Sequence, residues 1–262
     1  MTEHGDYDTL LDNLEELQLT TVNGRITEIV GMLIKAIVPN VKIGEVCLVK
    51  REGEPLRTEV VGFTQDEVFL SPLGEMTGVG PSSEVIPTKL PLHIKVGPKL
   101  LGRVLNGIGE PIDEHLHGPL DVDEVYPIIG PPPHPLTRQR ITEPISVGIR
   151  ALDGVLTTGK GQRIGIFAAA GGGKSTTLGM IARNAVADVN VISLIGERGR
   201  EVRDFIEKDL GPEGLAKSVV IVSTSDQSSQ LRLNAAYVGM AIAEYFRDQG
   251  KSVILMQDSI TR

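Results

Sequence analysis

The chain has 262 residues, of which 40% are hydrophobic and 23% charged, as is usual for a folded globular protein of one or two domains. Its formal net charge is -8, from 34 acidic and 26 basic residues, and only 3% of its residues are aromatic. Both values argue against a nucleic-acid-binding protein, which needs a basic stripe and rings for base stacking. We expect no membrane span, since no run of about 18 apolar residues occurs, and no secretory signal, since the start is acidic.

Residues 1–19 are expected to form an acidic leader. Leucines recur there at near-helical spacing (Leu10, Leu11, Leu14 and Leu17), which predicts a short amphipathic helix. An ordinary peripheral helix and a helix that docks on a partner or a membrane surface are both open, although its acidity disfavours anionic lipid.

A β-rich domain is predicted over residues 20–91. Its short apolar runs, separated by Gly, Pro and Asn, are 24–30, 33–37, 45–49, 59–61 and 67–70. Strands at this spacing predict a small barrel or a sandwich, without a catalytic constellation. The single cysteine, Cys47, lies in one of these runs and is expected to be a buried apolar residue. It cannot form an internal disulfide, so a reducing compartment is the simplest interpretation.

A Gly- and Pro-rich connector, residues 92–144, opens the second predicted domain, residues 92–262. The prolines from Pro131 to Pro135 cannot lie inside a helix and are expected to run extended. His115 and His117 lie in a turn-rich stretch, where solvated histidines are the main interpretation and a metal site the alternative.

From Ser146 onward the hydrophobic pattern alternates between strands and helices. We expect strands at 163–168, 189–195, 219–223 and 252–256, and helices at 175–186, 199–210 and 228–247, with Gly250 just beyond the last helix. Such alternation predicts βαβ units and therefore a parallel α/β sheet.

The run IGIFAAAGGGKS, residues 164–175, is typical of a phosphate-binding loop. Its amides would surround phosphate, Lys174 would reach the β- and γ-phosphates, and Ser175 would hold Mg²⁺. The predicted nucleotide-binding residues are Ala170, Gly171, Gly172, Gly173, Lys174, Ser175 and Thr176. Ala168 stands where the pattern has glycine, so a glycine-rich turn with an incidental lysine stays open as an alternative.

Two further strand ends carry residues suited to phosphate chemistry. Asp258 follows an apolar strand, where it either binds Mg²⁺ through water or caps a turn. Ser259 rather than a glutamate follows it, so the carboxylate that activates water is sought at Glu197, beyond the strand 189–195. Arg198 would assist at the phosphates and Glu201 would reach the Mg²⁺ shell. The alternative for this stretch is a solvated helix start with i,i+4 ion pairs.

Several motifs resemble those of the type III protein-export ATPases of injectisomes and flagella, which are similar to the β subunit of rotary ATP synthases. The motifs are LLGRVLNGIGEPID, IRALDGVLTTGKGQRIGIFAAAGGGKST, SLIGERGREVRDF and VILMQDSITR. The resemblance implies an N-terminal β-barrel oligomerisation domain and a P-loop, RecA-like α/β domain. It also implies ATP and Mg²⁺ as ligands, with Glu197, Arg198 and Lys174 catalytic, and Ser175, Glu201 and Asp258 around the metal. Gln257 departs from the family, which usually has an apolar residue there.

The resemblance further implies a homohexamer on the cytoplasmic face of the bacterial inner membrane. Its expected partners are stalk and stator-like regulator proteins of the export apparatus, chaperones, and the substrates that it releases and unfolds, with no nucleic acid. The alternatives are an RNA-translocating hexameric helicase, a rotary proton-translocating ATPase subunit and a non-catalytic assembly module. The residues IRALDGVLT argue against the rotary subunit.

Family members continue well beyond the position of Arg262. That part holds the adenine-stacking residue, the arginine finger and the helical C-terminal domain. The resemblance therefore implies that this chain is a truncated piece, which we expect to hydrolyse ATP slowly or not at all and to form hexamers poorly.

Overall fold

The computed structural model describes residues 22–169 and 171–262. The predicted leader and its helix lie outside the described residues, and so does Ala170. The chain separates into two compact units, with the boundary between Lys89 and Leu90.

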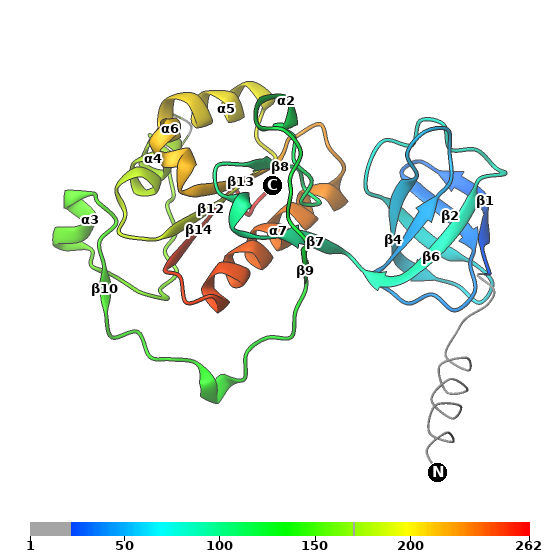
Figure 1. The fold of residues 1–262 in the computed structure, drawn as a ribbon, viewed down its shortest axis with the longest axis horizontal. Coiled ribbons are helices and arrows are strands. Elements are labelled where there is room, and N and C mark those ends of the chain that lie inside the picture. Colours follow the sequence, from blue (N-terminus) through cyan, green and yellow to red (C-terminus); the bar gives the residue numbers. More distant parts are fainter. Residues whose placement is uncertain (1–21, 170) are drawn as a thin grey trace, which may run out of the picture. The chain divides into compact units, whose positions relative to one another are not determined.

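The N-terminal unit is a closed antiparallel barrel with the strand order β1-β2-β5-β4-β3-β6 (Figure 1). Its strands are β1 (Gly24–Val30), β2 (Leu33–Ile37), β3 (Glu45–Val49), β4 (Leu56–Phe63), β5 (Val68–Pro72) and β6 (Glu84–Pro91). Pairing of β6 with β1 closes the barrel, which decides between the two architectures that the sequence left open. The first three strands have the predicted bounds.

Alternating side chains of these strands fill the barrel interior. Ile34, Val49, Val60 and Leu70 are fully buried there, and so is Cys47, as expected. Burial, together with the nearby charge of Glu45, raises the pKa of the Cys47 thiol to about 12.

The C-terminal unit is built on a parallel sheet with the strand order β14-β12-β13-β8. The strands are β8 (Val104–Leu105), β12 (Val189–Ile195), β13 (Ser218–Ser223) and β14 (Val253–Asp258). Every residue of β12 and β13 is buried, because helices cover both faces of the sheet. The predicted parallel α/β fold is therefore confirmed.

The helices α4 (Lys174–Asn184), α5 (Gly199–Asp204) and α6 (Gly211–Ala216) lie on one face, and α7 (Ser229–Asp248) lies on the other (Figure 1). The predicted helix 199–210 changes at Phe205 into a π-helical turn, Phe205–Leu210. The last helix ends as predicted, since Gly250 has φ +79° and donates to the carbonyl of Arg247. No helix in the described part of the chain combines the length and apolarity of a membrane span.

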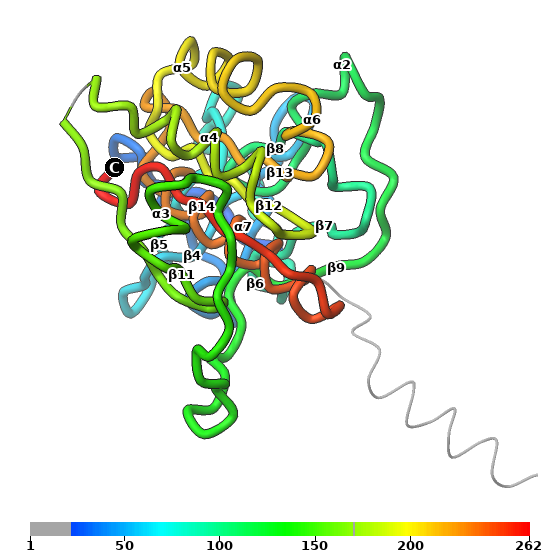
Figure 2. The backbone as a smooth tube through the Cα atoms, turned by 90° about the vertical axis from the view of Figure 1, so that its left-hand side faces the viewer, coloured from blue at the N-terminus to red at the C-terminus, as the bar shows by residue number. Residues whose placement is uncertain are grey.

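Short elements surround this sheet. The strands β7 (His93–Val96) and β9 (Glu124–Pro127) pair with each other, as do β10 (Pro144–Ile145) and β11 (Thr158–Gly159). The single-turn helices are η1 (Pro98–Leu100), α2 (Glu114–His117) and η2 (Pro135–Thr137), and α3 spans Arg150–Val155. The segment between β9 and β10 projects away from the sheet (Figure 1, Figure 2). Residues 131–134 form no regular element there, and Pro135 begins a 3₁₀ turn, which its fixed φ permits.

One predicted strand is wrong. Residues 163–169 form no regular element, and Phe167 is 96% exposed. An apolar run becomes a strand only when a neighbouring strand accepts its backbone hydrogen bonds. The sheet ends at β14, and the run makes no ladder with that edge. Its apolar composition alone therefore does not place it in the sheet.

Candidate nucleotide site

Two glycines of the glycine-rich loop have backbone angles that favour glycine. Gly171 and Gly173 have φ values of +77° and +80°, where a Cβ is disfavoured, and α4 begins at Lys174. A Cβ on Gly172 would lie 2.9 Å from that of Ala168. Among the described residues other than glycine, positive φ occurs at Asn40 and Lys89, so the backbone at Ala168 does not need glycine. The mismatch at Ala168 is thus no obstacle.

The carboxyl ends of β12 and β14 meet beside this loop. Leu194 pairs in register with Asp258, so Glu197, two residues beyond β12, comes to the same edge as Asp258. The ammonium of Lys174 forms an ion pair with Asp258, whose side chain is only 5% exposed. A small pocket of about 90 Å³ lies here, lined by Ser175, Leu194, Glu197, Glu201, Val202, Phe205 and Asp258. The structure therefore brings together residues from three separate parts of the sequence.

Arg262 is a member of this cluster that the sequence analysis missed. Its Nη1 lies 3.1 Å from Oε2 of Glu197 and donates to the carbonyl of Gly196 at 2.8 Å. The sequence feature that could have pointed to Arg262 is its basic side chain, four positions after Asp258. Sequence gives no indication that the chain turns back toward β12 after β14, so the contact emerges only from the fold.

The two glutamates of the site have opposite pKa shifts. Burial raises the pKa of Glu197, with smaller contributions from its hydrogen bond to Glu201 and from the charge of Asp258. The same hydrogen bond lowers the pKa of Glu201, which is also near the Arg198 guanidinium at 3.6 Å. Glu197 is therefore the more basic of the two carboxyl groups. Arg198 is 65% exposed and points toward Glu201, so it is not part of the pocket lining.

The oxygen atoms of the pocket suit Mg²⁺. The hydroxyl of Ser175 and the carboxylates of Glu201 and Asp258 are hard ligands of the kind that Mg²⁺ prefers. The described residues contain no group of three His, Cys, Asp or Glu side chains placed to hold a metal by themselves. Thr176 is exposed at the start of α4, and His115 and His117 are exposed on α2.

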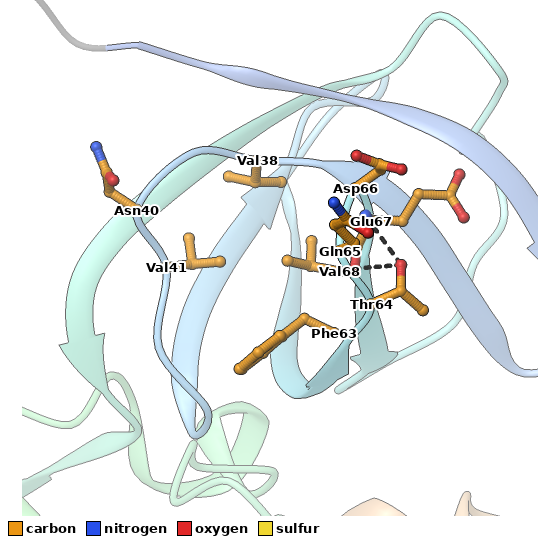
Figure 3. A pocket seen from close by; sticks show the side chains of 9 residues that line it. All are labelled: Val38, Asn40, Val41, Phe63, Thr64, Gln65, Asp66, Glu67 and Val68. Carbon is orange, nitrogen blue, oxygen red and sulfur yellow. Dashed lines mark hydrogen bonds between the residues drawn. The ribbon is translucent and has the colours of Figure 1, made fainter.

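A pocket on the barrel offers different chemistry. It measures about 190 Å³, and Val38, Asn40, Val41, Phe63, Thr64, Gln65, Asp66, Glu67 and Val68 line it (Figure 3). Its charged residues, Asp66 and Glu67, are acidic, whereas at the end of β12 and β14 the ammonium of Lys174 pairs with the lining residue Asp258. The pocket at the end of β12 and β14 is therefore the candidate nucleotide site.

The fold and this site define a two-unit protein with a β-barrel and a P-loop α/β nucleotide-binding domain. Residues 26–89 match the β-barrel domain of the ATP synthase alpha/beta family, and residues 148–262 match its nucleotide-binding domain. The chain belongs to this family.

Two relatives of the chain are named for the type 3 secretion system and for the flagellum. It is 52% identical over 260 residues to a type 3 secretion system ATPase of Xanthomonas euvesicatoria and 46% identical over 261 residues to a flagellum-specific ATP synthase of Bacillus subtilis. Each match covers 97% of this chain and 58% of the relative. The chain thus spans little more than half the length of these relatives.

A solved structure has the same fold. The assembled ATPase EscN in complex with its central stalk EscO, from the type III secretion system of enteropathogenic E. coli, matches with a TM-score of 0.83 and 45% identity. The match covers 91% of this chain and 58% of that one. It confirms the barrel followed by a nucleotide-binding domain.

Proposed function

We propose that this chain binds ATP with Mg²⁺ and contributes to its hydrolysis in a bacterial export ATPase of the type III secretion or flagellar kind. The ATPase would use that energy to release chaperones and unfold export substrates. The similarity to named export ATPases supports this function. The observation that carries it is the convergence of Lys174, Ser175, Glu197 and Asp258 at one edge of the sheet.

The residues of the loop would hold the phosphates. Amides of the loop residues 170–173 and of the start of α4 would surround an anion at this helix end, and Lys174 would add a positive charge. Thr176 would also contact the nucleotide, at the same end of α4. Mg²⁺, held through Ser175, Asp258 and Glu201, would neutralise phosphate charge.

Glu197 would orient and polarise the attacking water. Its raised pKa makes it a better proton acceptor than an ordinary carboxylate once it is ionised. Arg262 already lies against it, and Arg198 stands next in the chain. Either guanidinium would stabilise charge that develops on the phosphates, and Arg262 is the nearer to Glu197.

The partners of this function follow from the relatives. EscN is described as assembled and in complex with its stalk. We propose a homohexamer, with the barrel of residues 20–91 as its oligomerisation domain and residues 92–262 as the ATPase domain. Stalk and stator-like regulator proteins, chaperones and substrates would bind it at the cytoplasmic face of the inner membrane.

The first test is nucleotide binding, since the chain spans 58% of its relatives. A fluorescent ATP analogue is titrated into the 262-residue chain with Mg²⁺. We expect Lys174→Ala to weaken binding about tenfold or more, because it removes a charge-assisted contact. Lys160→Ala is the matched control, since Lys160 pairs with Glu143 on the surface of the same unit. Equal affinity of wild type and Lys174→Ala would refute the proposed site.

A further inference from the structure

Lys174 and Asp258 are each other's partners in the structure, although each also has a role toward the ligand. Lys174 begins α4 and Asp258 ends β14, 84 positions later in the chain. The Asp258 side chain is 5% exposed and that of Lys174 is 31% exposed. A carboxylate so deeply buried requires a compensating cation. For Asp258, the structure supplies that cation from the phosphate-binding loop.

The other cations of the site are engaged elsewhere. The Arg262 guanidinium contacts Glu197 and the Gly196 carbonyl, and Arg198 extends to Glu201 at the exposed rim. Neither forms an ion pair with Asp258. If Lys174 moves to a phosphate, the Asp258 carboxylate stays buried, beside the acidic side chains of Glu197 and Glu201 and facing the negative charge of the phosphates.

We propose that the Lys174–Asp258 ion pair competes with nucleotide and that Mg²⁺ relieves this competition. The inference rests on the proposed function, since both residues belong to that site. Nucleotide recruits Lys174 and leaves Asp258 uncompensated, and a divalent cation restores the missing positive charge. Nucleotide and Mg²⁺ therefore strengthen each other's binding by the same factor, as linkage requires.

Removal of the Asp258 charge should uncouple the two ligands. In Asp258→Asn, Lys174 no longer has to leave a buried carboxylate. We expect nucleotide without metal to bind more tightly than to wild type, by about tenfold. Mg²⁺ should then add little. The same replacement also removes repulsion between Asp258 and the phosphates, which does not depend on Lys174, so it is repeated in a Lys174→Ala background, where competition predicts a smaller gain in metal-free binding.

The experiment titrates a fluorescent ATP analogue into the full 262-residue chain, once with excess EDTA and once with Mg²⁺. The variants are Asp258→Asn, Lys174→Ala, the double variant of the two and the control Glu143→Gln. The control removes an exposed carboxylate that also pairs with a lysine, 2.8 Å away. Circular dichroism and thermal unfolding show that each variant is folded.

Tighter metal-free binding by Asp258→Asn, with a smaller gain in the Lys174→Ala background and the control unchanged, supports the competition. Unchanged or weaker metal-free binding by folded Asp258→Asn, or an equal gain in both backgrounds, overturns it, even if Lys174→Ala confirms the nucleotide site. If wild type and Lys174→Ala bind alike, the proposed function fails and the inference with it. If Asp258→Asn does not fold, Lys174→Met takes its place, with Mn²⁺ alone as the probe. Tighter Mn²⁺ binding than in wild type supports the competition, and unchanged or weaker binding overturns it.

Discussion

Replacing Asp113 by alanine should strongly destabilise the C-terminal unit. Asp113 is 5% exposed and pairs with Arg103, which is 7% exposed. The guanidinium donates to both carboxylate oxygens, from Nε at 3.0 and 3.1 Å and from Nη2 at 2.8 Å. Asp113 also accepts from the amide of Val104 at 2.8 Å, at the start of β8. The Asp113 carboxylate thus neutralises the buried guanidinium of Arg103 and accepts a hydrogen bond from the first residue of β8.

In Asp113→Ala, Arg103 keeps its 2.8 Å bond to the Gly118 carbonyl, but its charge loses its counterion. Breaking one partner of a buried ion pair costs about 3–5 kcal/mol. Domains are stable by about 5–15 kcal/mol, so the loss should be a large part of the total. The double variant Arg103→Met/Asp113→Leu should be less destabilised than the single one, because it leaves no unpaired charge.

Urea unfolding followed by tyrosine fluorescence measures this loss. The chain has no tryptophan. Three of its four tyrosines, Tyr126, Tyr237 and Tyr245, lie in the C-terminal unit, so most of the signal reports on that unit. Asp121→Ala is the control, because Asp121 and its partner Lys99 are both exposed. A loss below about 1 kcal/mol for Asp113→Ala, or one equal to the control's, would refute the reasoning.

Three other perturbations test the pKa shifts and the packing. Cys47, with its pKa raised to about 12, should resist a thiol reagent at neutral pH until urea unfolds the barrel, and rapid labelling of the native chain would contradict this. The folded chain raises the pKa of Glu197 above its ordinary 4.5, so ionisation of Glu197 costs stability as pH rises from there. The difference in unfolding free energy between Glu197→Gln and wild type should therefore shift in favour of the variant as pH rises from 4.5. A difference that does not change with pH would contradict the raised pKa. Gly239→Ala places a Cβ 2.1 Å from Ser193 Oγ and should cost about 1–3 kcal/mol, which Ser193→Ala should partly restore in a double variant.

Much of the fold was predictable because hydrophobic periodicity reflects burial. The strand 189–195 was predicted to the residue, since both faces of β12 are buried and its sequence is almost continuously apolar. The strand β6 was missed because its burial is partial and ends in exposed residues. The run 163–168 was predicted as a strand but forms none. Apolar character shows that burial of a segment is favourable, but not whether a neighbouring strand accepts its backbone hydrogen bonds.

The sequence by itself determined the class of chemistry. Three consecutive glycines before Lys174 permit a loop backbone that residues with a side chain disfavour, and carboxylates after apolar strands gather at one edge of a parallel sheet. Only the tertiary structure decided which charges neutralise each other. Lys174 with Asp258 and Arg262 with Glu197 are separated by 84 and 65 positions, and long side chains choose partners by distance and burial, which no local pattern encodes.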